Sequence, residues 1–109
     1  MDFTKAAHVF QEYLKDYDQN NDKVRLKIVH TYGVVKQAQE VCSRRNLDEE
    51  TVSLAKIIAL LHDIGRFEQL KQFDSFEPTT MDHAAYGVQI LFEEGMIRRF
   101  MPDDRWDEI

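Results

Sequence analysis

Apolar residues recur along the chain three or four positions apart, the spacing of one face of a helix, and not in the alternating runs of strands. In residues 3–17 the polar Lys5 and His8 lie off this stripe, which predicts an amphipathic surface helix. The stripe comprises Phe3, Ala6, Phe10, Tyr13, Leu14 and Tyr17. Residues 18–21 are all of turn-forming types, so the helix is expected to end there.

Two further helices are expected before residue 66. Asp22 is a suitable N-cap for a helix that runs to about Arg44. Its core stripe comprises Val24, Ile28, Tyr32, Val35, Ala38 and Cys42. The next helix begins at Asp48, whose side chain can accept from the free N–H groups of the first turn, and it ends at Gly65. Nearly every side of this third helix is apolar, so we expect it to be the buried axis of the domain.

The remaining third of the chain is less regular. Residues 66–81 show no sustained period, and loops of that length in compact domains are usually functional or mobile. A fourth helix is expected from about Asp82 to Glu94, with Gly95 as its C-terminal stop. Its inward side chains are expected to be Ala84, Ala85, Val88, Leu91 and Phe92. The pattern therefore predicts an all-α protein with one domain over residues 1–109.

Composition and charge narrow the classes of function. Fourteen Lys and Arg against twenty Asp and Glu give a net charge of -6, which disfavours binding to extended nucleic acid. The single cysteine, Cys42, excludes an internal disulfide and a zinc site built on several cysteines. No apolar run approaches the roughly 20 residues that cross a bilayer, and residues 1–10 lack the apolar stretch of a signal peptide. We therefore expect a cytoplasmic protein without membrane contact.

The candidate chemistry lies at His62 and Asp63, which follow the most apolar helix. Burying both side chains without partners is unfavourable. A divalent cation would satisfy them, because neutral imidazole and ionised carboxylate are good ligands and a helix C-terminus favours positive charge. His30 can point inward from the second helix, and His83 opens the fourth. Each histidine alone is more often a core or capping residue, but their joint placement around a buried His-Asp pair favours a metal site.

The order of these residues resembles the HD superfamily of metal-dependent phosphohydrolases. It comprises a His on one helix, His-Asp ending the next, and an Asp-His that opens a later helix. Residues 62–69, His-Asp-Ile-Gly-Arg-Phe-Glu-Gln, are similar to those of a bacterial subgroup of HD proteins. The resemblance covers His30 to the C-terminus and implies an HD-domain-like helical bundle. It also implies that His30, His62 and Asp63 bind one divalent ion (Mn, Mg, Zn, Ni or Fe), and that His83 is a ligand in members with a second ion.

The implied activity is the hydrolysis of a small phosphate ester, such as a nucleotide. Asp63 would orient the attacking water, and Arg66 would offset charge on the phosphoryl oxygens. Lys71 is a second candidate for phosphate, although a solvated cation is its simpler interpretation, and residues 66–81 would cover the site as a mobile lid. Two alternatives stay open. One is a non-catalytic helical binding or regulatory module with an incomplete metal site, and the other is an oxygenase that holds two irons.

The chain departs from the family pattern at its C-terminal end. HD domains complete the metal ligands with an Asp on a later helix, and residues 102–109 have the pattern of the first turns of such an element. Asp103, Asp104 and Asp107 have the wrong spacing to replace the family ligand. We therefore expect an incomplete HD domain that is weakly active or inactive. Uncovered apolar surface predicts self-association into a homo-oligomer.

Overall fold

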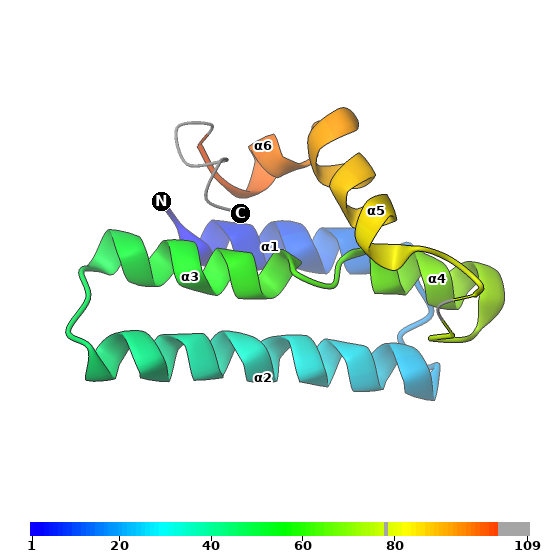
Figure 1. Ribbon diagram of the computed structural model, residues 1–109, viewed down its shortest axis with the longest axis horizontal. Helices are drawn as coiled ribbons and strands as arrows, with labels where there is room; N and C mark the ends of the chain where they lie inside the picture. Colours follow the sequence, from blue (N-terminus) through cyan, green and yellow to red (C-terminus); the bar gives the residue numbers. More distant parts are fainter. Residues whose placement is uncertain (78, 103–109) are drawn as a thin grey trace.

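The computed structural model describes residues 1–77 and 79–102, and every regular element within these ranges is a helix. In chain order the elements are α1 (Phe3–Leu14), α2 (Asp22–Arg44), α3 (Glu49–Leu61), α4 (Gly65–Phe73), α5 (His83–Val88), the π-helical turn η1 (Gln89–Glu93) and α6 (Ile97–Phe100). The predicted all-α class is confirmed. Helices α1, α2 and α3 run along the length of the molecule, α4 continues beyond α3, and α5 leaves at a steep angle (Figure 1). None of these helices combines the length and apolar character needed to cross a membrane.

The starts of α2 and α3 depend on side chains that accept hydrogen bonds from the first turn. Asp48 begins α3 as predicted, and its Oδ1 accepts from the Thr51 N–H at 2.7 Å. Helix α2 also begins where expected, but its N-cap is Asn21 and Asp22 is already helical. The Asn21 side-chain oxygen accepts from the Lys23 N–H at 2.8 Å. Either residue type stabilises a helix by about 1 kcal/mol at this position, so the sequence alone did not separate the two neighbours.

The core forms where α3 contacts both α1 and α2. Helix α1 buries most of its predicted stripe, and Phe10 meets Phe67 of α4 edge-on with ring centroids 5.8 Å apart. Helix α3 contributes Leu54, Ile57, Ala59, Leu60 and Leu61. Because α3 is covered by neighbours on two sides, its nearly continuous apolar sequence is satisfied as predicted.

The expectation for residues 66–81 was wrong over its first half. Helix α3 ends at Leu61 and not at Gly65, and Gly65 instead begins α4. Phe67 and Leu70, three positions apart, are buried on one face of α4. This helical period is difficult to see in the sequence because α4 is short and its buried face also includes a polar residue, Gln69.

The helix expected over residues 82–94 is present, but it buries a different face. Asp82 caps α5, and the chain then widens into η1, where the Glu94 N–H bonds to the Gln89 carbonyl at 2.9 Å. The wider turn changes the phase of the side chains from Gln89 onward, so it affects Phe92 but not Ala84, Ala85 or Val88. Leu91 is buried as expected and Ile90 joins it, whereas Ala84, Ala85, Val88 and Phe92 are exposed. The expected self-association through uncovered apolar surface stays a prediction.

The start of α4 lies unusually close to the start of α5. A Cβ placed on Gly65 would be 2.0 Å from the carbonyl oxygen of His83 and 3.1 Å from the backbone nitrogen of Gly87. No side chain fits in this space, so glycine is required by the approach of two backbones. The contact fixes where α5 leaves the bundle, and with it the position of His83.

Candidate metal centre

His62 and Asp63 lie at the junction between α3 and α4. His62 is the C-cap of α3, and Asp63 follows in the short turn before Gly65. This turn is closed by a hydrogen bond of 2.9 Å from the Arg66 N–H to the Asp63 carbonyl. The end of a helix carries partial negative charge, which favours a bound cation.

The ring orientation of His62 is set by the backbone of its own helix. Its Nδ1 lies within hydrogen-bond distance of the Ala59 carbonyl, which can only accept, so Nδ1 carries the proton. In the neutral ring Nε2 then presents a lone pair to Asp63 Oδ2, 3.3 Å away. Two acceptors facing each other at this distance are stabilised by a cation between them, or by a second proton on the imidazole.

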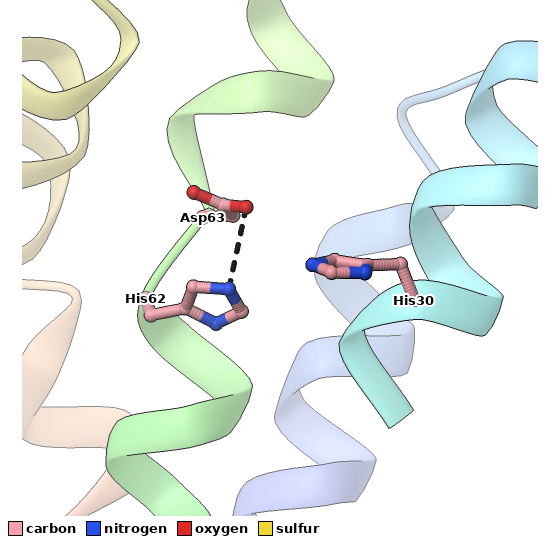
Figure 2. Close-up of side chains that lie close together, drawn as sticks. All are labelled: His30, His62 and Asp63. Carbon is pink, nitrogen blue, oxygen red and sulfur yellow. Dashed lines mark ion pairs between the residues drawn. The ribbon is translucent and has the colours of Figure 1, made fainter. Parts of the chain in front are cut away.

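His30 approaches the same point from α2. Figure 2 shows its ring directed across the gap between the helices toward His62 and Asp63. The ring centroids of His30 and His62 are 5.9 Å apart. One ligand atom from each of His30, His62 and Asp63 lies within 4.8 Å of the other two. The structure therefore brings together the three residues that the sequence proposed for one ion.

The spacing of these three atoms fits a divalent cation after a small adjustment. Two nitrogen ligands that each lie about 2.1 Å from a tetrahedral zinc ion are about 3.4 Å apart, so ligand atoms separated by 4.8 Å would have to approach each other by about 1.4 Å. His30 and His62 are exposed at the surface of the bundle, where side-chain rotation is possible. Two imidazoles and one carboxylate suit Zn, Mn, Fe or Ni.

His83 adjoins this group but lies outside it. Its Nε2 is 3.7 Å from Asp63 Oδ1, the carboxylate oxygen that does not face His62. Burial and the positive charge of Arg66 lower the pKa of His83, although the charge of Asp63 opposes this. His83 is therefore neutral at pH 7, the protonation state in which imidazole binds metals.

Lys27 is a member of the site that the sequence analysis missed. Its Nζ lies 3.1 Å from Asp63 Oδ2, and only 14% of its side chain is exposed. Burial would raise the pKa of Asp63, but the Lys27 hydrogen bond and the charges of His62, Lys27 and Arg66 outweigh it, so this pKa lies below its ordinary value. Lys27 precedes His30 by three positions, and this helical spacing was the only signal in the sequence.

The HD domain profile matches residues 28–107, which include the three histidines and Asp63. The chain belongs to the HD domain family. This family is that of the metal-dependent phosphohydrolases, whose members typically bind divalent ions at a His/Asp cluster. Within the chain, the matched segment begins inside α2, so α1 and Lys27 lie before it.

This HD domain is similar to two curated proteins of Caenorhabditis elegans, Pumilio domain-containing protein 7 and Pumilio domain-containing protein 6. Each is 27% identical to the chain over 96 residues. The match covers 86% of the chain and 19% of each relative, so the chain spans about a fifth of their length. No solved structure matches the chain significantly.

Arg66 lies near Asp63, and its Nη1 is already engaged in hydrogen bonds. Its Nη1 donates to Gln69 Oε1 at 3.0 Å and to the Phe76 carbonyl at 3.1 Å. The guanidinium also lies 5.5 Å from the Phe76 ring centroid. Lys71, the other candidate for phosphate, lies over the Tyr17 ring at 5.5 Å and is exposed, as a surface cation would be.

Gln69 connects α4 to the segment that follows it through side-chain hydrogen bonds. Its side chain is fully buried, and its Nε2 donates to the Glu77 carbonyl at 3.0 Å and to Thr80 Oγ1 at 3.1 Å. With the Arg66 bond to the Phe76 carbonyl, these contacts tie Phe76, Glu77 and Thr80 to α4. The segment after α4 therefore has specific anchors.

Replacing Gln69 with leucine should loosen this segment. The change removes the three hydrogen bonds of the Gln69 side chain, to Arg66, the Glu77 carbonyl and Thr80 Oγ1, so the free energy of unfolding should fall by about 1–3 kcal/mol. Amide hydrogen exchange at Thr80, whose N–H bonds to Glu77, should become faster. Gln72→Leu is the matched control, because Gln72 is exposed and bonds only to Glu68 among the contacts described. Unchanged exchange at Thr80 in Gln69→Leu would contradict the anchor.

Proposed function

We propose that this HD domain is a metal-dependent phosphohydrolase acting on a small phosphate ester, such as a nucleotide. The observation that carries the proposal is the convergence of His30, His62 and Asp63 at the end of α3. Membership in the HD family supports it independently. The phosphate ester would enter from solvent, because both histidines are exposed on the same side of the bundle.

The side chains of the site have distinct roles in this proposal. His62 offers Nε2 because the Ala59 carbonyl holds the proton on Nδ1. Asp63 is ionised at neutral pH because its pKa is lowered, so it can both bind a cation and accept a hydrogen bond from the attacking water. A divalent cation, when bound, supplies Lewis acidity toward the phosphoryl oxygen and acidifies water. Arg66 contributes positive charge at the edge of the site, where it offsets charge that builds up on the phosphate.

His83 would bind a second ion, if the site takes one. Its Nε2 faces Asp63 Oδ1, whereas His62 faces Oδ2, so His83 and Asp63 together would hold that second ion. Counting ions per chain by elemental analysis tests this role directly.

The test is a metal titration combined with a hydrolysis assay. Purified protein stripped with EDTA should bind Mn²⁺, and hydrolysis of 4-nitrophenyl phosphate or nucleoside monophosphates should require the added ion and stop on chelation. His62→Ala should weaken Mn²⁺ binding at least about 10-fold. His8→Ala is the matched control, because His8 is exposed on α1 and pairs with Glu12 away from the site.

Other results would favour the two alternatives. Failure to bind Mn²⁺, Zn²⁺ or Fe²⁺ would overturn the proposal and leave a helical binding module. Tightly bound iron with consumption of oxygen, and no release of phosphate, would indicate the oxygenase.

A further inference from the structure

Lys27 places a positive charge on the same carboxylate oxygen that faces His62. Its Nζ lies 3.1 Å from Asp63 Oδ2, and His62 Nε2 lies 3.3 Å from the same oxygen. An ammonium group with 14% of its side chain exposed has given up most of its contact with water. The pair is therefore a partly buried ion pair, and removing either charge would leave the other without a compensating partner.

A bound divalent ion would compete directly with this ion pair. Ligation by His30, His62 and Asp63 uses the carboxylate that Lys27 now contacts, and an ammonium next to a divalent cation is repelled. The other oxygen, Oδ1, is 3.7 Å from His83 Nε2. Lys27 must then weaken or leave its contact with Asp63 when the ion binds.

The surroundings of Lys27 keep its charge at the site when this contact is released. Its Nζ lies 5.4 Å from the ring centroid of Phe76, and the Arg66 guanidinium lies 5.5 Å from the same ring. Two cations from different helices, α2 and α4, thus flank Asp63 around one aromatic side chain. Lysine has a flexible stem and three donors, so its ammonium can move a short distance to a new anion.

We propose that Lys27 is a phosphate-binding residue that exchanges its partner: Asp63 in the metal-free protein, and a phosphoryl oxygen of the substrate in the metal-loaded protein. The inference rests on the proposed function. It names the ligand as a phosphomonoester, because two flanking cations match a dianionic phosphate better than the single negative charge of a diester.

The experiment compares Lys27→Met and Lys27→Arg with Lys23→Met. Lys23 is the matched control: it also lies on α2 and pairs with a carboxylate, Asp74 Oδ2 at 3.2 Å, but it is 47% exposed and away from the site. Three quantities are measured for each variant. They are the Kd for Mn²⁺ by calorimetry, the Kd for inorganic phosphate with Mn²⁺ present, and KM and kcat for a phosphomonoester.

Lys27→Met should bind Mn²⁺ more tightly, by about 5- to 10-fold, since the competing cation is gone. Its Kd for phosphate and its KM should rise by about 10-fold or more, with a smaller change in kcat. Lys27→Arg should keep phosphate binding within a few-fold of the wild type. Lys23→Met should match the wild type in all three measurements.

Wild-type hydrolysis with unchanged KM and phosphate affinity in Lys27→Met would overturn this inference and leave the proposed function intact. A wild-type protein that binds no metal and releases no phosphate would overturn both. If Lys27→Met does not fold, as judged by circular dichroism, Lys27→Gln provides a polar replacement. Phosphate affinity that is unchanged in Lys27→Gln would likewise reject the role.

Discussion

Asp63→Ala should lower kcat/KM for phosphomonoester hydrolysis by at least about 100-fold, and Mn²⁺ affinity by a similar factor. Loss of a residue that only supports a metal ligand already lowers affinity or activity by about 10- to 100-fold. Asp63 is itself in the proposed ligand set, and it also faces His62, His83 and Lys27. One substitution therefore removes a ligand and leaves three other groups without their common anion.

The matched control for this change is Asp74→Ala. Asp74 also pairs with a lysine of α2, Lys23, but its side chain is 65% exposed and takes no part in the site. Its loss should change kcat/KM by less than about 2-fold, because exposed ion pairs contribute little. Circular dichroism of Asp63→Ala should show a folded helical protein. Hydrolysis that requires Mn²⁺ yet persists in this variant would contradict the assignment of Asp63.

Gly65→Ala should destabilise the fold more than any other glycine substitution among the four in the chain. The new Cβ would lie 2.0 Å from the His83 carbonyl oxygen, and backbone cannot rotate aside as a side chain can. We expect the free energy of unfolding to fall by about 3 kcal/mol or more, which is a large part of the stability of a small domain. Separation of α4 from α5 would also move His83 away from Asp63.

Gly33→Ala provides the opposite result from the same chemical change. Gly33 lies inside α2, and among the described residues no atom beyond its chain neighbours and its own helix backbone lies within 4 Å of an added Cβ. Alanine should therefore stabilise the helix by up to about 1 kcal/mol. Urea unfolding of both variants measures the contrast. Equal stability of Gly65→Ala and wild type would show that α4 and α5 do not meet as closely as described.

Features that act within one turn of the chain could be predicted from the sequence. Asp48 and Asp82 begin their helices because an N-cap bonds to the first turn that follows it. The apolar stripe of α1 likewise identified its buried face. Gly65 shows the limit of this approach. A glycine after an apolar run usually ends a helix, whereas here it permits contact with a carbonyl of a later helix.

The candidate site was likewise predicted only in part from the sequence. His30, His62 and Asp63 were proposed because few structures satisfy such residues around an apolar helix, and the structure brings them together. Lys27 was missed because a lysine on an amphipathic helix is ordinarily solvated, and its partner is 36 positions away. Gln69 was missed for a related reason: its burial depends on a backbone segment that folds back over α4.

The π turn η1 makes the connection between α5 and α6 sensitive to insertions and deletions. A π turn holds about one residue more than an α-helical turn, so deleting one residue there would restore α-helical winding. The following segment would rotate by about 100°, and Ile97 and Phe100, now 0% and 2% exposed, would turn away from α1. The proposed metal-binding residues all precede η1. Evolutionary insertions or deletions at this turn would therefore change how α6 packs against α1. They would leave the relative positions of the proposed metal ligands unchanged.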